Sequence, residues 1–129
     1  NLKINNAEIS NSGNDCADFS FGEYQLINMK LSYCGDKGLS IGEKSFVKLK
    51  DLQAKETNVG VATKDYGVLL AENLELNNVK DCVAAYNKKQ EFSGGMIDIK
   101  KINCSNFNRL LNLDITSIIK IKENFSEKR

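Results

Sequence analysis

The side chains able to carry chemistry in this chain of 129 residues are lysines, tyrosines, carboxylates and four cysteines, because the sequence contains no histidine. The commonest general base and the commonest metal ligand are therefore both missing. The cysteines lack CxxC spacing, which argues against a zinc site. We expect the protein to hold no metal ion and no cofactor. The four cysteines are Cys16, Cys34, Cys82 and Cys104.

Several of the polar residues recur at steps of 22 residues, which would stack them on one surface. One such set includes Lys64 and Tyr86, and a Lys or Tyr can act as a general base where burial or a neighbouring charge lowers its pKa. Paired carboxylates about 5 Å or 6.5–9.5 Å apart could instead serve a glycosidase. The two sets are Asp18, Ser40, Ala62, Ala84 and Asn112, and Ser20, Gly42, Lys64, Tyr86 and Asp114.

This spacing belongs to an internal repeat that covers most of the chain. Gly38 has counterparts at Cys16, Gly60 and Cys82, each 22 residues from the next. Apolar residues form further columns with steps of 22, 23, 22 and 28, so about six residues are inserted between Asn87 and Gly95. One column is Ile4, Leu26, Leu49, Ala71 and Ile99; the next is Ala7, Met29, Leu52, Leu74 and Ile102.

The apolar positions within each unit alternate in twos and threes, as short strands joined by tight turns do. No window sustains the spacing of an amphipathic helix. Repeated short strands bury a continuous core only when they stack, with successive coils paired in parallel. We therefore predict an all-β fold, a parallel β-helix (solenoid) of about five coils of 22–28 residues, forming one domain over residues 1–122 with a charged tail at 123–129.

One column between the core positions is polar: Asn6, Asn28, Asp51 and Asn73, followed by Lys101. Asn tolerates the left-handed conformation, and stacked Asn side chains can bond along the stack. We expect an Asn-ladder turn here; the alternative is that Asn is merely frequent in turns.

The same columns place the cysteines apart. Cys16 and Cys82 share a column but lie three coils, about 14 Å, from each other, beyond the reach of a disulfide. Cys34 and Cys104 fall in neighbouring columns of different coils. We expect four buried free thiols that pack as small hydrophobic side chains.

The repeat resembles the right-handed parallel β-helix of the pectate-lyase-like superfamily, including its Asn-ladder turn. Three segments, residues 15–22, 35–45 and 85–92, are similar to uncharacterised β-helix regions of bacterial surface proteins. The resemblance runs from about Leu2 to Leu113 and implies a right-handed coil. It is weak for activity, because that superfamily includes lyases, hydrolases, epimerases, adhesins and inert spacers.

The resemblance also implies a substrate groove over the strand at 17–19 and its counterparts. The family's calcium-dependent lyases use clustered Asp and an Arg base, but here Ala62 and Ala84 occupy the centre, and Arg109 and Arg129 are the only arginines. We therefore expect a solvated face rather than a catalytic one. The groove would carry Asp18, Lys37, Ser40, Glu43, Lys64, Asp65, Tyr86, Lys88 and Lys89.

The inserted loop at 87–95 is the second candidate site. Tyr86 and Phe92 would flank it with aromatic surface, and insertions in solenoids often lie on the binding face. Sugars are commonly held by an aromatic face with amides and charges nearby. The alternative is a loop that only covers the side of a coil.

These observations favour a non-catalytic β-helix module of a bacterial surface or secreted protein, located outside the cell, that binds polysaccharide or acts as a spacer. The alternative is a fragment of a polysaccharide lyase or epimerase. A formal net charge of +1 argues against nucleic acid as a partner, and no apolar run is long enough to span a membrane. Residues 1–14 supply only half a coil, so we expect a missing upstream domain or another chain to contact the N-terminal coil.

Overall fold

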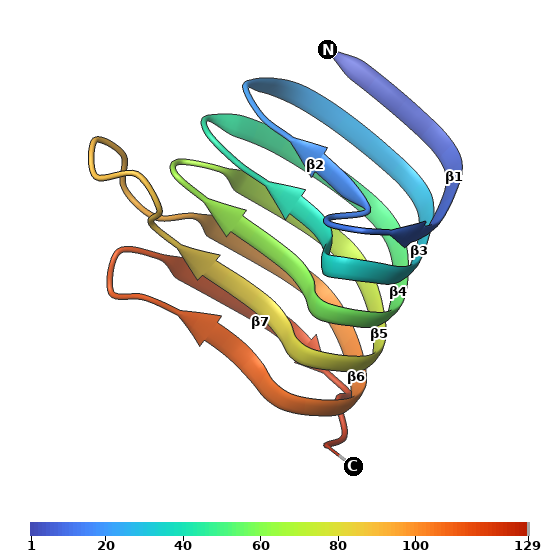
Figure 1. Cartoon of the computed structure of the whole chain (residues 1–129). Coiled ribbons are helices and arrows are strands. Elements are labelled where there is room, and N and C mark those ends of the chain that lie inside the picture. Colours follow the sequence, from blue (N-terminus) through green and yellow to red (C-terminus); the bar gives the residue numbers. More distant parts are fainter. Residues whose placement is uncertain (129) are drawn as a thin grey trace.

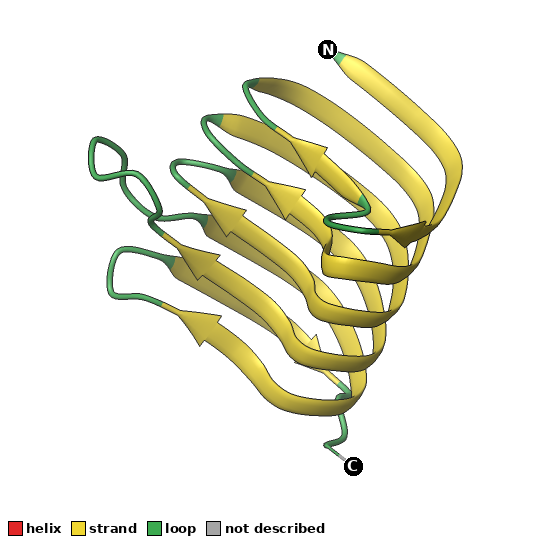
Figure 2. Ribbon diagram, in the orientation of Figure 1, coloured by secondary structure: helices red, strands yellow, loops and turns green. Residues whose placement is uncertain are grey.

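Apolar residues that lie one repeat apart in the sequence lie side by side in the structure. The computed structural model describes residues 1–128 and shows an all-parallel β-solenoid of about six turns (Figures 1 and 2). The strands pair in the order β1-β3-β4-β5-β6-β7, with the short β2 paired to β3. Their bounds are β1 (Leu2–Ser12), β2 (Ala17–Phe19), β3 (Gly22–Ile41), β4 (Ser45–Lys64), β5 (Val68–Tyr86), β6 (Met96–Leu113) and β7 (Ile118–Asn124).

The register of these pairs reproduces the predicted columns. Ile4 pairs with Leu26, Leu26 with Leu49, Leu49 with Ala71 and Ala71 with Ile99. The column continues into β7, where Ile99 pairs with Ile121. The all-β parallel solenoid is thus confirmed, with about six turns instead of five. The right-handed sense of the coil stays a prediction.

Each coil is one long bent strand rather than several short strands with turns between them. In β4, Leu49 and Leu52 are both buried although they are three residues apart, which marks a bend at Asp51. A second bend lies at Glu56, whose φ is 55°. The two bends divide each coil into three arms, which in β4 are residues 45–50 (arm A), 52–55 (arm B) and 59–64 (arm C).

The two bends use different residues of the repeat. The second bend takes a left-handed residue in every coil from the first to the fifth, namely Asn11, Tyr33, Glu56, Asn78 and Asn106. At the first bend only Asn6 and Asn28 are left-handed, and the amide of Asn28 donates to Oδ1 of Asn6 at 2.6 Å. The Asn73 amide likewise donates to Asp51 at 3.3 Å. The column therefore bonds in two pairs, and a continuous Asn ladder stays a prediction.

The interior is filled by the inward side chains of all three arms. Leu26, Leu49 and Leu74 are at most 1% exposed, and they belong to one core cluster that extends from coil to coil. Arm C approaches the next coil closely at Gly38 and Gly60. A Cβ at Gly60 would lie 2.6 Å from the carbonyl oxygen of Cys82, so these glycines serve close backbone packing.

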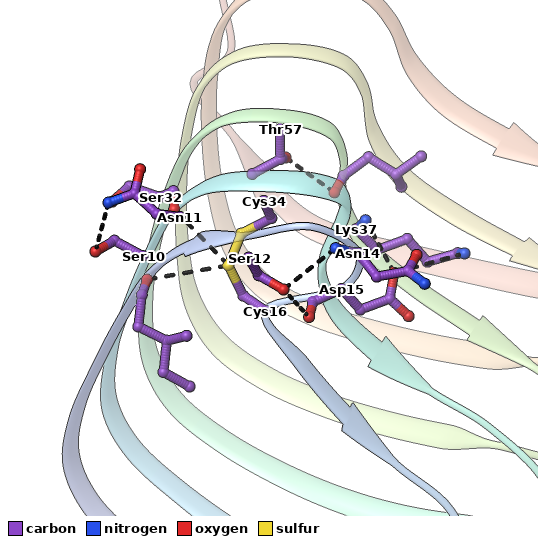
Figure 3. Close-up of a disulfide and its surroundings, with 12 residues drawn as sticks. Ser10, Asn11, Ser12, Asn14, Asp15, Cys16, Ser32, Cys34, Lys37 and Thr57 are labelled. Carbon is purple, nitrogen blue, oxygen red and sulfur yellow. Dashed lines mark hydrogen bonds and ion pairs between the residues drawn. A yellow bond between two sulfur atoms is a disulfide. The ribbon is translucent and has the colours of Figure 1, made fainter.

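The prediction of four free thiols is wrong. Cys16 bonds to Cys34 and Cys82 to Cys104, with Cα–Cα distances of 5.3 Å and 6.4 Å. Each disulfide joins adjacent coils through two different columns, which meet across the bend between arms B and C. Comparison of residues within one column could not reveal this pairing. Figure 3 shows the first disulfide beneath the loop that carries Asp15.

The chain remains ordered beyond the expected domain end at residue 122. β7 ends at Asn124, and the backbone N–H groups of Phe125 and Glu127 donate to the carbonyls of Ile102 and Cys104. Part of the segment expected to be a tail therefore continues the sixth turn. Residues 1–128 include no helix of the length and apolarity needed to cross a bilayer.

Candidate functional site

The outward side of arm C, where the resemblance implied a groove, is closed. Ser40, Ala62 and Ala84 are stacked in register, as predicted, but they are only 1%, 1% and 3% exposed. The two alanines lie outside the core cluster although they are buried. Asp18 is exposed at one end of the column and Asn112 half-buried at the other, where its amide donates to Asp81 at 3.0 Å. The column is thus a covered floor rather than an open cleft.

Charged groups do converge beside this floor. We call Asp15, Asp36, Lys37 and Tyr86 the polar cluster. The Lys37 ammonium lies 2.8 Å from Asp36 and 3.9 Å from Asp15, and the Lys37 backbone N–H donates to the Asp15 carboxylate at 3.1 Å. Figure 3 shows Asp15 and Lys37 facing each other next to the Cys16–Cys34 disulfide. Lys37 was expected in the groove; its two acidic partners were not.

The polar cluster keeps its lysine charged. Burial alone would lower the pKa of Lys37, but the hydrogen bond to Asp36 and the nearby Tyr86 and Asp15 raise this pKa above its usual value. The hydrogen bond from Lys37 holds the pKa of Asp36 below its usual value despite partial burial. At neutral pH the cluster is therefore an ion pair, with Lys37 as a hydrogen-bond donor.

Tyr86 is poorly suited to act as a base. Burial raises the pKa of its phenol, and the neighbouring Lys37 offsets this rise only in part. A tyrosine base needs a lowered pKa, so Tyr86 offers a hydroxyl donor instead. Lys64 is half-buried, pairs in register with Tyr86 and passes over Gly42, where its Cε lies 3.2 Å from the position a Cβ would take. Tyr86 therefore lacks the surroundings of an activated base.

The loop at 87–95 is anchored by two carboxylates. Asp65, which is fully buried, accepts hydrogen bonds from the backbone N–H groups of Lys88 and Lys89 at 2.7 Å and 3.0 Å. Asp114 accepts one from the N–H of Asn87 at 2.7 Å, which holds the pKa of this carboxyl below its usual value. Three of the predicted site residues, Asp65, Lys88 and Lys89, are thus brought together, but the carboxylate binds the backbone of the loop rather than facing outward.

The loop folds back onto the turns of the two preceding coils. The Lys89 ammonium lies 2.8 Å from Glu43, and this pairing raises the pKa of Lys89. The Phe92 ring packs edge-on against Tyr66 with centroids 5.7 Å apart, and the Lys44 ammonium lies 5.4 Å from the centre of the Phe92 ring. The loop projects from the side of the solenoid at the end of arm C (Figure 1).

We call Lys44, Tyr66 and Phe92 the loop platform. Tyr66 is 49% exposed and Phe92 is half-buried, so the two rings present apolar surface to solvent beside a cation. Phe92 was predicted as a site residue, whereas its partners were not. Tyr66 and Lys44 carry a weak sequence signal, since both occupy left-handed turn positions just before a strand. Tyr86, predicted to flank the loop with aromatic surface, belongs to the polar cluster instead.

Side chains that could ligate a metal ion do not gather. Across residues 1–128, no three acidic or cysteine side chains lie close enough together to hold a metal ion. The cysteines are all in disulfides, which cannot coordinate a metal as thiolates do. The residues that the structure brings together are therefore suited to hydrogen bonding and stacking.

No protein-family model, curated protein or solved structure matches the chain.

Proposed function

We propose that the chain is a non-catalytic β-solenoid module of a secreted or cell-surface protein, and that it binds glycan at the loop platform. The observation that carries this proposal is the exposed Tyr66 ring packed against the half-buried Phe92 ring beside the Lys44 ammonium. Sugar rings present C–H faces that stack on aromatic surfaces, while their hydroxyls bond to polar side chains. The ion pair between Lys89 and Glu43 supplies such groups next to the platform.

Two further observations support this function over catalysis. The floor of the expected groove consists of the buried Ser40, Ala62 and Ala84, and the raised pKa values of Lys37 and Tyr86 make these two residues poor bases for a sugar C–H proton. The relation to pectate-lyase-like β-helix regions of bacterial surface proteins belongs to the same proposal. It is supported by the parallel solenoid and the paired Asn column.

The two disulfides support a location outside the cytosol. Structural disulfides persist in oxidising compartments and are rare where thiols are kept reduced. Cys82 and Cys104 are fully buried, which suits a permanent bond between coils rather than a transient one. An extracellular or cell-surface location follows as a proposal.

Glycan binding can be tested by comparing the wild-type chain with the variant Tyr66→Ala/Phe92→Ala on an array of polysaccharides. Loss of both rings should weaken binding at least about tenfold, as the loss of aromatic anchors does at other interfaces. Tyr66→Phe should retain binding, because it keeps the ring. Tyr33→Ala is the matched control: Tyr33 is 55% exposed and left-handed like Tyr66, but it lies at the second bend. Equal loss in both variants, or no glycan bound at all, would refute the proposal.

A second candidate, a polysaccharide lyase or epimerase fragment, is favoured by two groups on arm C: the interacting Lys37 and Tyr86, and a buried Ser40 hydroxyl that has no hydrogen-bond partner among the described residues. A screen for unsaturated products from alginate, pectin and glycosaminoglycans separates the two functions. Turnover abolished by Lys37→Met or Lys64→Ala would establish the enzyme and overturn the binding module.

A further inference from the structure

The outward side of arm A, which we call the arm-A face, is strongly basic. It presents six lysines and three carboxylates, a surplus of three positive charges on a chain whose formal net charge is +1. All six lysines are exposed. The lysines are Lys3, Lys48, Lys50, Lys100, Lys120 and Lys122, and the carboxylates are Glu23, Glu72 and Asp98.

The strand register aligns these lysines along the solenoid. Lys3 and Lys48 belong to one column, which continues through Leu70 and Asp98 to Lys120. The other three lysines, Lys50, Lys100 and Lys122, each come two residues after a member of this column, on β4, β6 and β7. Coils stack at about 4.8 Å, so the face extends about 24 Å across the six turns. Within residues 1–128 none of the six lysines takes part in an ion pair, in contrast to Lys37 and Lys89.

Apolar side chains lie between the lysines on the same face. One column contains Glu23, Phe46, Val68, Met96 and Ile118, next to the column that contains Lys48 and Lys120. Two shallow hollows occupy the face. One, of about 360 Å³, is lined by Lys3, Phe46, Lys48 and Glu23, and the other, of about 410 Å³, by Lys50, Lys100, Leu70, Glu72 and Asp98, among others. Lysines, apolar side chains and the three carboxylates are therefore interspersed on this face.

The neighbouring side of arm B provides the contrast. Its groove of about 500 Å³ is lined by Glu8, Lys30, Lys55 and Glu75 together with amides and hydroxyls. The charges of the two lysines and the two glutamates cancel, so this surface has no net charge. The basic character is thus confined to one of two adjacent faces built on the same strands.

We propose that the arm-A face binds an acidic polysaccharide, with the polymer lying along the solenoid axis. The lysines match its carboxylate or sulfate groups, and the apolar column matches the C–H faces of its rings. This inference rests on the proposed glycan-binding function and names the class of glycan. A polysaccharide fits better than a membrane, because Val68, Leu70 and Met96 are half-buried and leave Phe46 and Ile118, 37% and 53% exposed, as isolated apolar contacts at separate coils. The disulfides favour an extracellular polymer over nucleic acid.

The test is binding of polygalacturonate to the intact chain at several salt concentrations, with fully methyl-esterified polygalacturonate as the uncharged probe. Lys48→Gln/Lys50→Gln should weaken binding about tenfold and flatten its salt dependence, because two cations leave the face. Lys30→Gln/Lys55→Gln removes the same charge from the adjacent face and should leave the affinity within about twofold. All four lysines are exposed, so both variants should fold.

Four results would overturn the proposal: equal weakening by the two double variants, equal binding of the acidic and esterified polymers, tighter binding of duplex DNA, or tighter binding of phosphatidylserine vesicles.

The loop-platform variant Tyr66→Ala/Phe92→Ala separates this inference from the proposed function. Glycan binding lost in that variant but unchanged by Lys48→Gln/Lys50→Gln would refute the arm-A face alone. Binding of polygalacturonate lost in the lysine variant but unchanged in the platform variant would support the arm-A face and refute the loop platform.

Discussion

At the scale of single residues, the stacking of coils leaves little room for a side chain at two glycines of arm C, Gly38 and Gly60. A Cβ at Gly38 would lie 2.7 Å from the carbonyl oxygen of Gly60, and one at Gly60 would lie 2.6 Å from that of Cys82. Neither glycine has a positive φ, so the requirement is for space and not for a special backbone conformation. These contacts bring arm C of one coil against arm C of the next.

Gly60→Ala should therefore lower the free energy of unfolding by about 1–3 kcal/mol, the usual cost of forcing an extra carbon into a packed site. Urea unfolding measures the change. Gly13→Ala is the control, because a Cβ at Gly13 meets no atom within 4 Å. Equal stability of the two variants would show that the coils can separate enough to accept a methyl group.

At the scale of elements, the loop at 87–95 is held by carboxylates at its base. Asp114 accepts hydrogen bonds from Asn87, Thr116 and Ser117, which lower its pKa from the ordinary Asp value of 3.8. A lowered pKa in the folded state means that the ionised carboxylate stabilises the fold above the unfolded pKa. This stabilisation is lost as the pH falls through the folded pKa.

We expect the wild-type chain to melt at a higher temperature than Asp114→Asn at pH 6. This difference in melting temperature should shrink toward zero below about pH 4. Thermal unfolding followed by circular dichroism from pH 7 to pH 2.5 measures it. Asp18→Asn removes the same charge at an exposed position and should differ little from wild type at any pH. If the difference in melting temperature between wild type and Asp114→Asn did not depend on pH, the charge of Asp114 would not be its cause.

The disulfides act on the same scale, because each joins two adjacent coils. Cys16 is half-exposed, whereas Cys82 and Cys104 are fully buried. A mild reductant without denaturant should therefore open Cys16–Cys34 first, and thiol alkylation with mass spectrometry should detect that order.

Cys82→Ala/Cys104→Ala should lower the free energy of unfolding by about 3 kcal/mol, since the bond closes a separation of 22 residues. Free thiols in the untreated protein would contradict the pairing.

At the scale of the whole molecule, the solenoid has two free edges. β1 lies at one end of the strand order and β7 at the other (Figure 1). Leu2 is 51% exposed on β1 and Ile118 is 53% exposed on β7. Unpaired strand edges with apolar side chains are templates for pairing with another chain.

We expect the β1 edge to pair with another chain, so the protein should associate as its concentration rises. Leu2→Lys should weaken this association, because it places a charge on an exposed side chain of the edge strand. Sedimentation velocity over a range of concentrations measures both effects. A strict monomer at high concentration would show that the bare edge is tolerated.

The sequence alone determined the architecture of this protein. A side chain at a given position of the repeat meets the same neighbours in every coil, so equal spacing already implies parallel pairing and its register. The pairing of Ile4 with Leu26 and of Leu26 with Leu49 follows directly from steps of 22 and 23 residues. The same regularity placed Gly38 and Gly60 in one column and revealed the insertion that forms the loop at 87–95.

Only the tertiary structure decided which columns face one another across the coil. The spacing orders residues along a strand but does not measure the angle of a bend, so the meeting of Cys16 with Cys34 was invisible in the sequence. The covering of Ser40 and Ala62 and the packing of Tyr66 on Phe92 were invisible for the same reason. Long side chains and an irregular loop pack on the surfaces that the bends create, and the spacing of the repeat does not define those surfaces. The repeat therefore specifies the scaffold, and the contacts between its columns specify the candidate sites.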